Sequence, residues 1–517
     1  MSDIKILWAD DEIEMLKSQI MFLEQKGYVV DPVSNGIDAV EKFTANHYDI
    51  VFLDESMPGI SGLETLSRMK KIHPNIPIVL ITKNEEEDLM EDAIGAQISD
   101  YLIKPVKPQQ ILLSLKKLID NKRLISEKTG DTYRQEFQKI MMQINNYMTH
   151  DEWVDLYRQL IYWELQLEQT DNEQMHEILD MQKAEANKEF FKFISKNYID
   201  WLKPHAKDAP TLSHTLFDDQ VKEYLKDDVP TFFLLIDNLR YDQFKKIEHV
   251  FVKMFNKVKE EHMYSILPTT TQYSRNAIFS GMTPLEIYKN YPDKWFFYDE
   301  DEGKNLHEDF FLGKQLERLD FDGKFSYTKV TTNKAGKELE DNILNLVNNK
   351  FNVIVYNFVD MLSHARTEME VLKELASDEV AYRSLISSWF VHSPLHNALQ
   401  RIKDKKVRII LASDHGSIRV GTHTKVIGDK HTTTNLRYKT GRSLNYNAKD
   451  VFEVKKPSDA MLPQGNISSS YIFAKEDYYL CYPKSYSYFA NYYKNTFQHG
   501  GISLEEVIVP FAVFETK

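Results

Sequence analysis

Cysteine is almost absent from the sequence, since Cys481 is the only one in 517 residues. This excludes a disulfide framework and a thiolate zinc cluster, so any metal must be held by histidine and carboxylate side chains. Long apolar runs are missing too, because no stretch of about 18 apolar residues is present that could span a bilayer. The amino terminus, MSDIKILWADDE, has no basic segment followed by an apolar one. We therefore expect a cytoplasmic protein without membrane insertion.

Positive charge is in deficit, with 64 basic against 78 acidic residues and a formal net charge of −14. This balance argues against a protein whose whole surface binds DNA or an anionic membrane. No helix-turn-helix pattern follows the first domain, so direct DNA binding is not expected. The length and the 42% hydrophobic content are typical of a globular protein with several domains.

Residues 1–120 alternate short apolar runs with amphipathic segments. This alternation predicts a doubly wound, flavodoxin-like α/β domain with a parallel sheet, whose site lies at the carboxyl ends of the strands. The predicted strands are KILWAD, YVVDPVS, DIVFLD, IPIVLIT and DYLIKP.

Polar residues stand at the ends of four of these strands. Asp10 and Asp11 end the first strand, Asp54 the third, Thr82 the fourth and Lys104 the fifth. Three carboxylates gathered at one edge would repel one another unless a cation joined them, and oxygen ligands of this kind suit Mg²⁺. Lys104 would then add a positive charge for phosphoryl oxygens.

The segments ADDE, LDESMPG, ITK and YLIKP resemble the receiver domain of two-component response regulators. The resemblance implies a sensor histidine kinase as partner. Phosphorylation adds roughly −1.5 to −2 charges, and we expect it to pair two chains through the last helix–strand–helix face. The implied roles are Asp54 as phosphoryl acceptor, Asp10, Asp11 and Asp54 as Mg²⁺ ligands, Thr82 and Tyr101 as the switch pair, and Lys104 as the phosphate contact.

Residues 121–205 contain little proline or glycine and predict a helical bundle or connector. In DEWVDLYRQLIYWELQLEQ the apolar residues recur three and four positions apart, and Asp151 is a candidate N-cap. An aromatic stripe of this kind is typical of a helical core and predicts no chemistry. The residues expected on the buried face are Trp153, Leu156, Tyr157, Leu160 and Ile161.

Strand-like runs resume in residues 206–517, where we expect an α/β sandwich. TFFLLIDN ends in Asp237, NVIVYNFVDMLSH contains Asp360 and His364, and VRIILASDHGS contains Asp414 and His415. An Asp-His-Gly sequence after a strand also suits an ordinary turn. The recurrence of ligand-type residues at several strand ends favours a metal site instead.

The candidate ligands are sufficient for two ions. Asp360 and His364 are one helical turn apart and would share a face, and His499 precedes two glycines that permit close backbone approach. Zn²⁺ accepts imidazole and carboxylate ligands and keeps a position open in catalytic sites. The predicted sets are Asp360, His364 and His499 for one Zn²⁺, and Asp237, Asp414 and His415 for the second.

Three threonines precede a helical segment in LPTTTQYSRNAIFSGMTP, residues 267–284. Helix capping is the ordinary role for Thr269 or Thr270. A threonine hydroxyl becomes a useful nucleophile only when its pKa is lowered, and two metal ions can do this while stabilising an in-line displacement.

The motifs LLIDNLR, PTTT, VDMLSH, SDHGS and HGGISLEE resemble the alkaline phosphatase superfamily, and within it the PglZ domain. The resemblance implies a metal-dependent phosphodiesterase acting on cyclic or short oligonucleotides, with Thr271 as nucleophile. Arg275 and Asn276, one turn further on, are candidate contacts to the substrate phosphate. The choice of zinc over manganese also comes from the family, since both accept these ligands.

The order of receiver, helical segment and PglZ domain resembles a family of regulators associated with type IX secretion. An alternative function remains open: a zinc-stabilised, phosphorylation-switched module that binds a sigma factor or secretion component with little or no catalysis. A basic loop, residues 424–442, is either a solvated surface or a guide for a polyanionic substrate. It carries Lys425, Lys430, Arg437, Lys439 and Arg442.

Overall fold

A computed structural model of the chain gives two compact units. One comprises Met1–Arg134 with Gln169–Asn172, and the other Gln135–Glu168 with Glu173–Lys517. The structure describes residues 4–74, 76–83, 98–115, 118, 121–170, 173–204, 206–297, 305–376, 378–429, 432–466 and 468–517. The domain boundaries at residues 120 and 205 remain predictions.

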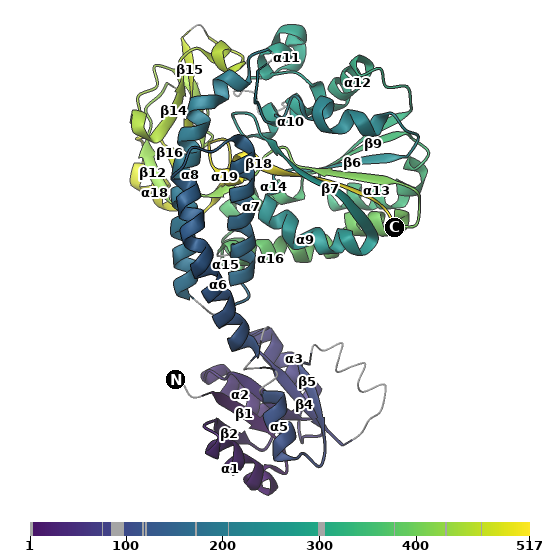
Figure 1. Cartoon of the computed structure of the whole chain (residues 1–517), viewed down its shortest axis with the longest axis vertical. Coiled ribbons are helices and arrows are strands. Elements are labelled where there is room, and N and C mark those ends of the chain that lie inside the picture. Colours follow the sequence, from purple (N-terminus) through teal and green to yellow (C-terminus); the bar gives the residue numbers. More distant parts are fainter. Residues whose placement is uncertain are drawn as a thin grey trace. The chain divides into compact units, whose positions relative to one another are not determined.

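The first unit contains a five-stranded parallel sheet in the order β2-β1-β3-β4-β5 (Figure 1). This is the flavodoxin-like order, in which the ligand site lies where the order reverses, between β1 and β3. The predicted doubly wound fold is confirmed. The strands are β1 (Lys5–Ala9), β2 (Val29–Val33), β3 (Ile50–Asp54), β4 (Ile78–Thr82) and β5 (Asp100–Ile103).

Apolar side chains cover both faces of this sheet. Leu23 of α1 and Ile111 of α5 join one buried cluster, whereas Phe43 of α2 and Leu66 of α3 join the other. The fully buried pattern of β3 and β4 follows from this double cover. The helices are α1 (Lys17–Gln25), α2 (Gly36–Ala45), α3 (Gly62–Ile72) and α5 (Pro108–Leu115).

Three long helices follow: α6 (Asn121–Ile144), α7 (His150–Leu167) and α8 (Glu173–Trp201). The five apolar residues predicted on one face of α7 are all buried, which confirms that face as core. The N-cap of α7 is Thr149 rather than Asp151, because Thr149 and Glu152 form a reciprocal capping box.

The second unit is built around a six-stranded mixed sheet in the order β7-β18-β10-β6-β9-β8. Strands β10, β6, β9 and β8 run parallel, and β18 runs antiparallel between β10 and β7. Strands β6, β9 and β10 are buried along their whole length, which suits central strands covered on both faces, whereas the edge strands β7 and β8 are partly exposed. The strands are β6 (Thr231–Ile236), β7 (Phe255–Tyr264), β8 (Phe325–Val330), β9 (Phe351–Tyr356), β10 (Arg408–Ala412) and β18 (Ile508–Thr516).

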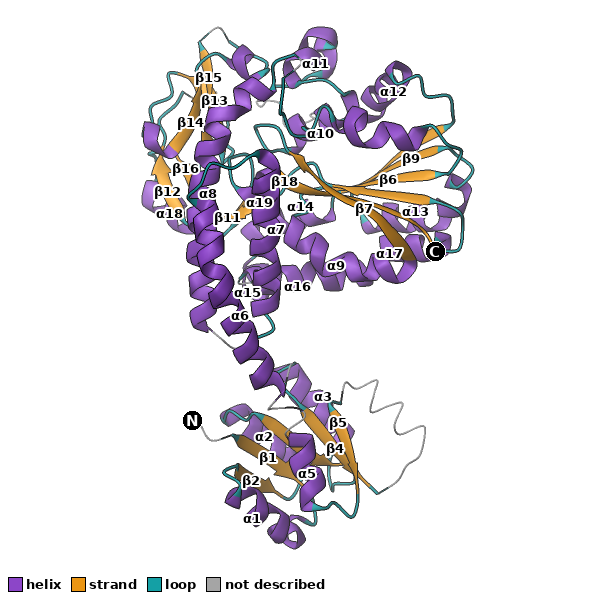
Figure 2. Ribbon diagram, viewed as in Figure 1, coloured by secondary structure: helices purple, strands orange, loops and turns teal. Residues whose placement is uncertain are grey.

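Helices lie on both sides of this sheet, with α10 and α12 on one face and α9 and α16 on the other (Figure 2). The expected α/β sandwich is therefore confirmed. The helices are α9 (Tyr241–Met254), α10 (Thr271–Ser280), α11 (Pro284–Asn290), α12 (Glu308–Arg318), α13 (Asn333–Leu346), α14 (Phe358–Glu368), α15 (Glu370–Leu375), α16 (Glu379–Val391), α17 (Pro394–Ile402), α18 (Tyr486–Tyr493) and α19 (Leu504–Val507).

The strands that follow β10 in the chain, up to β17, form small separate sheets. They pair β11 (Ile418–Arg419) with β17 (Phe497–Gln498), β12 (Thr422–Lys425) with β16 (Tyr478–Cys481), and β15 (Ser469–Ala474) with β13 (Tyr438–Arg442) and β14 (Val451–Val454). Among the helices in the described ranges, none has the length and apolarity needed to cross a bilayer.

Candidate metal centre and active site

The carboxyl ends of the parallel strands bring the predicted ligands of the second unit together. Asp237 follows β6, Asp360 lies in the first turn of α14 after β9, and Asp414 and His415 follow β10. His499 follows β17, and its side chain lies beside Asp360 and His415. Because β6, β9 and β10 are adjacent and parallel, their ends form one edge where an open α/β sheet binds ligands.

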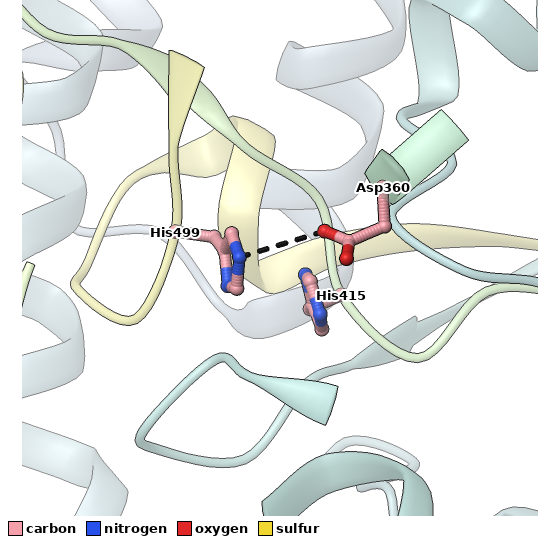
Figure 3. Close-up of side chains that lie close together, drawn as sticks. All are labelled: Asp360, His415 and His499. Atoms are coloured by element: carbon pink, nitrogen blue, oxygen red, sulfur yellow. Dashed lines mark ion pairs between the residues drawn. The ribbon is translucent and has the colours of Figure 1, made fainter. Parts of the chain in front are cut away.

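Two groups of ligand atoms form there. In each group the atoms lie within 4.8 Å of one another: Asp360, His415 and His499 in the first (Figure 3), and Asp237, Asp414 and His415 in the second. His499 Nε2 is 3.6 Å from Asp360 Oδ1, and His415 Nε2 is 3.6 Å from Asp237 Oδ1. Since His415 belongs to both groups, the two form one continuous cluster.

Both histidines present Nε2 to this cluster. His415 Nδ1 lies 3.1 Å from the carbonyl oxygen of Gly416, and His499 Nδ1 lies 3.2 Å from that of Thr269. A carbonyl only accepts, so Nδ1 carries the proton and Nε2 keeps a lone pair. Burial lowers the pKa of His415 and lowers that of His499 well below its usual value, so both rings stay neutral. Neutral imidazole oriented by a carbonyl is the form that binds metal.

The carboxylates carry more negative charge than the protein neutralises. Burial, and next the charge of Asp237, raises the pKa of Asp414 well above its usual value and that of Asp360 to about 6. Burial also acts to raise the pKa of Asp237, but Arg275 and His415 outweigh it and lower that pKa. Asp414 Oδ2 is buried and accepts no hydrogen bond from any described residue. A divalent cation would satisfy this oxygen and relieve the repulsion.

The Thr271 hydroxyl points into the second group, at 3.3 Å from Asp237 Oδ1 and 3.1 Å from His415 Nε2. Thr271 is the first residue of α10, and Thr270 occupies the N-cap position without a side-chain cap hydrogen bond. Thr269 donates to the carbonyl oxygen of Gly501 at 3.0 Å and accepts from Gly500 N at 3.0 Å. The three threonines therefore have three different roles, and only Thr271 lies among the ligands.

The two glycines after His499 permit the close approach that the sequence predicted. Gly500 has a φ of +121°, and a side chain at Gly501 would lie 2.6 Å from the carbonyl oxygen of Ala474. Glu506 fixes the same turn, since its carboxylate accepts Gly501 N at 2.9 Å and pairs with the buried guanidinium of Arg437. The segment that holds His499 is thus tightly determined by its neighbours.

His364 lies at the edge of the cluster. Its Nε2 is 3.5 Å from Asp360 Oδ2, as one turn of α14 requires, but its side chain is 62% exposed. The ring centroid of His364 is 5.9 Å from that of His499. His364 therefore lies next to the first group. The histidine that joins Asp360 and His499 in that group is His415.

Arg275 occupies a different place from the substrate contact that the sequence suggested. Its buried guanidinium donates to Asp237 at 2.6 Å and to Glu308 at 2.5 Å, so it is held by carboxylates rather than presented to a substrate. Asn276 is also buried, and its Nδ2 donates to the carbonyl oxygen of Gln272 within α10. Arg275 therefore contacts Asp237 directly, and its role as a substrate contact remains a prediction.

Asn238 was not identified from the sequence. Its backbone N donates to Asp414 Oδ1 at 3.2 Å and its Nδ2 to Asp360 Oδ1 at 3.2 Å, so it connects the two groups. Asn238 has a φ of +62°, a conformation that asparagine adopts more readily than most residues. An asparagine directly after a strand-ending aspartate was the available signal.

The described cations of the basic loop differ in their exposure. Arg437 and Lys439 are buried, with Arg437 paired to Glu506 and Lys439 donating to the carbonyl oxygen of Thr433 at 2.9 Å. Lys425 and Arg442 are exposed, and Lys430 lies outside the described residues. Two of the five cations are therefore structural.

A cavity of about 600 Å³ opens beside the cluster. Asp360, His364 and His499 line it together with Thr271, and the remaining wall carries hydroxyl, amide and phenol groups. A hollow of this size accepts a ligand larger than inorganic phosphate. No lysine or arginine is among the described residues that line it: Thr270, Gln272, Asn305, Thr367, Glu368, Thr433, Thr434, Asn435, Leu436, Tyr438, Tyr492, Tyr493 and Gln498.

The first unit has its own acidic cluster at the ends of β1 and β3. Lys104 Nζ lies 3.0 Å from both Asp10 Oδ2 and Asp54 Oδ1. Asp10, Asp11 and Asp54 offer oxygens within 4.8 Å of one another, an arrangement that fits Mg²⁺. Burial raises the pKa of Asp54 to about 6, against the opposing effect of Lys104.

The two residues of the predicted switch pair differ in their surroundings. Thr82 is buried and donates to Glu55 Oε2 at 2.8 Å, whereas Tyr101 is 41% exposed. Glu55 follows Asp54 directly, so the hydroxyl of Thr82 is bonded to the residue next to the predicted phosphoryl acceptor.

Comparison with known families accounts for most of the chain. Residues 216–514 match the family described as the BREX system PglZ alkaline phosphatase-like domain. Residues 123–202 match the PorX response regulator linker domain, and residues 6–116 match the response regulator receiver domain.

Curated relatives resemble the chain over a shorter length. The transcriptional regulatory protein ResD of Bacillus subtilis is 32% identical over 118 residues, which are 23% of this chain and 49% of ResD. ZraR of Klebsiella oxytoca is 31% identical over 134 residues, which are 26% of this chain and 30% of ZraR. The matched regions thus span half or less of these relatives.

Solved structures of receiver domains are also similar. A receiver domain protein from Clostridium thermocellum has 32% identity and a TM-score of 0.22, covering 23% of this chain and 98% of that one. A CheY-like receiver domain from Methanospirillum hungatei has 25% identity and a TM-score of 0.23, covering 23% of this chain and 96% of that one.

Proposed function

Since this chain belongs to the PglZ family of alkaline phosphatase-like domains and has the domain set of PorX-like response regulators, we propose that it is a response regulator with a zinc-dependent phosphodiesterase as its effector. The substrates are cyclic or short oligonucleotides, and phosphorylation of Asp54 controls the activity. One observation carries the proposal: the Thr271 hydroxyl lies 3.1 Å from His415 Nε2 and 3.3 Å from Asp237 Oδ1, inside a cluster of metal-type ligands.

The donor atoms of this cluster fit two divalent ions. His415 can serve only one ion, because its Nδ1 is occupied by Gly416. If His415 joins Asp237 and Asp414, then Asp360 and His499 need a third ligand, and His364 is 3.5 Å from Asp360. This reasoning supports the two sets proposed from the sequence. When bound, such ions lower the pKa of a nearby hydroxyl and neutralise charge on phosphoryl oxygens.

Thr271 is the nucleophile in this proposal. Its Oγ1 forms a bond to phosphorus while the bond from phosphorus to the leaving oxygen breaks. The hydroxyl proton ends on that oxygen, so the step releases one alcohol and yields phosphothreonine that still carries the other ester group. The hydroxyl carries one proton and can donate it to Asp237 Oδ1 or to His415 Nε2, and either contact orients a lone pair of Oγ1 toward the cavity. Hydrolysis of phosphothreonine then releases the second product and restores the hydroxyl.

Turnover of a phosphodiester against a monoester tests this function. The zinc-loaded full chain should hydrolyse bis-p-nitrophenyl phosphate faster than p-nitrophenyl phosphate, and Thr271→Val should abolish both activities. Thr270→Val is the matched control, because the buried hydroxyl of Thr270 has no hydrogen-bond partner among the described residues. Full zinc-dependent turnover in Thr271→Val would refute the assignment of Thr271 as nucleophile. No turnover by protein shown to hold two zinc ions would favour the binding module.

The receiver domain supplies the control in this proposal. A sensor histidine kinase transfers a phosphoryl group to Asp54, with Mg²⁺ held by Asp10, Asp11 and Asp54 and with Lys104 contacting the phosphoryl oxygens. Thr82 and Tyr101 then change the surface that pairs two chains. Light scattering should show a doubled mass after treatment with acetyl phosphate and Mg²⁺, but not for Asp54→Ala. An unchanged mass of phosphorylated protein would rule out the homodimer.

The link to type IX secretion belongs to the same proposal. It is supported by the match of residues 123–202 to the PorX linker domain. A sigma factor or secretion component is the partner expected if the PglZ domain acts by binding. Capture of such a partner that is lost in Asp54→Ala and kept in Thr271→Val would favour the binding role over catalysis.

A further inference from the structure

Helix α18 presents an unusual concentration of aromatic rings beside the cavity. Five of its eight residues are aromatic: Tyr486, Tyr488, Phe489, Tyr492 and Tyr493. Tyr488 is 64% exposed and Phe489 is 37% exposed. Exposed rings gathered on one short helix leave apolar surface in water, which a monomeric protein normally covers or uses for binding.

The rings form two rows that lead away from the cavity. Tyr488 and Tyr492 have centroids 6.0 Å apart and planes inclined by 15°, and Phe489 and Tyr493 have centroids 6.0 Å apart and planes inclined by 14°. Tyr492 and Tyr493 line the cavity that also contains Thr271. Each row therefore joins a ring at the cavity wall to an exposed ring one helical turn earlier.

Charge and polarity around the rows favour a nucleic acid strand over an apolar partner. The exposed residues Lys484 and Lys494 flank the helix, and Lys373 Nζ lies 4.7 Å from the centroid of the Tyr492 ring. Asn435 and Gln498 of the cavity wall offer amide groups suited to the edges of bases. Cations for phosphates and flat rings for bases are the combination that single-stranded nucleic acids require.

We propose that α18 is a stacking platform that binds the bases next to the scissile phosphodiester of a single-stranded oligonucleotide. This inference rests on the proposed phosphodiesterase function and adds a preference for length. A small diester fills only the cavity, whereas a longer oligonucleotide also reaches Tyr488 and Phe489. Longer substrates therefore bind more tightly, while the chemical step at Thr271 is unchanged.

The kinetic test compares a small diester with an oligonucleotide in the full chain. In Tyr488→Ala/Phe489→Ala, the KM for hexadeoxyadenylate should rise about tenfold or more, because a base stacked on an aromatic ring contributes binding that alanine cannot replace. The kcat/KM for bis-p-nitrophenyl phosphate should stay within about twofold. The ring-preserving variant Tyr488→Phe/Phe489→Tyr should restore the KM. Tyr162→Ala, at an aromatic residue that is 55% exposed on α7, is the control for loss of surface aromatic area.

A binding measurement keeps the inference testable if the enzyme proposal fails. Fluorescence anisotropy of labelled hexadeoxyadenylate should give a Kd for Thr271→Val protein that rises about tenfold when Tyr488 and Phe489 are also replaced by alanine. If the unaltered zinc-loaded chain hydrolyses no diester but oligonucleotide binding still depends on these rings, the phosphodiesterase is refuted and the platform is kept. An equal Kd with and without the rings would overturn the platform, even if the enzyme is active.

Discussion

Asn187 of α8 holds Glu505, which lies six residues after His499, in a buried contact. Asn187 Nδ2 donates to the Glu505 carboxylate at 3.0 Å, and its Oδ1 accepts the backbone N–H of Leu504 at 2.7 Å. The carbonyl oxygen of Glu505 in turn lies against Gly416, where a side chain would approach within 2.0 Å. A helix of the region that matches the linker domain is thereby joined to both segments that carry His415 and His499.

Replacing Asn187 by alanine should loosen this part of the proposed site. The change leaves the Leu504 N–H and the Glu505 carboxylate buried without their partner, which costs about 1–3 kcal/mol. We also expect several-fold faster loss of zinc to a chromophoric chelator, because the His499 segment loses a support. Asn197→Ala is the control on the same helix, since among the described residues its side chain donates to the carbonyl oxygen of Phe193 alone. Equal chelation rates in both variants would argue against the coupling.

Arg275→Met should reduce stability rather than substrate affinity. Removing the guanidinium leaves Asp237 buried without its arginine partner and leaves Glu308 with Lys329, at 2.9 Å, as its cation. Breaking a buried pair costs about 3–5 kcal/mol. Denaturant unfolding should show this loss, while the KM of the remaining activity stays near that of the unaltered chain. A raised KM with unchanged stability would instead restore the substrate contact suggested by the sequence.

The number of zinc ions bound should differ between a variant of His499 and a variant of His364. His499→Ala should lose one of two zinc ions, because the ring is oriented by Thr269 and faces Asp360. His364→Ala should weaken the same ion without removing it at saturating zinc, since an exposed side chain is a poorly fixed ligand. Elemental analysis at graded free zinc measures both effects, with the exposed His392→Ala as control. Full zinc content in His499→Ala at low free zinc would refute the first ligand set.

The strand ends were predictable because apolar runs and parallel topology place them at one edge. β6, β9 and β10 each follow from a continuous apolar sequence, and Asp237, Asp360 and Asp414 follow from where those sequences stop. The same logic located Asp10, Asp11 and Asp54 at the receiver sheet. Local periodicity was sufficient for these residues.

Contacts across distant segments were not predictable in this way. His415 joins the group of Asp360 and His499 because the distant segment after β17 places the His499 ring with its centroid 4.3 Å from that of His415. The burial of Arg275 depends on Glu308, and that of Arg437 depends on Glu506. Thr149 caps α7 in place of Asp151 because Glu152 completes the capping box. A single sequence gives the residue types but not these partners.

His262 should contribute to acid instability of the second unit. Its Nδ1 accepts a hydrogen bond from Arg158 at 3.1 Å, and burial followed by the charge of Arg158 lowers its pKa to about 3. The unfolded chain takes up a proton near pH 6.5, whereas the folded protein does not until about pH 3. Between these values the unfolded state binds one more proton, so the free energy of unfolding falls as the pH falls.

His262→Gln keeps an acceptor for Arg158 and removes this proton uptake. Between pH 7 and pH 5, the free energy of unfolding of the variant should fall by about 2 kcal/mol less than that of the unaltered chain, because one proton contributes about 1.4 kcal/mol per pH unit below pH 6.5. Denaturant unfolding of metal-free protein, followed by a spectroscopic signal from the second unit, measures this difference. His249→Gln, at an exposed position on α9, should leave the pH dependence unchanged. Parallel pH curves for His262→Gln and the unaltered chain would show that His262 already takes up its proton in the folded state.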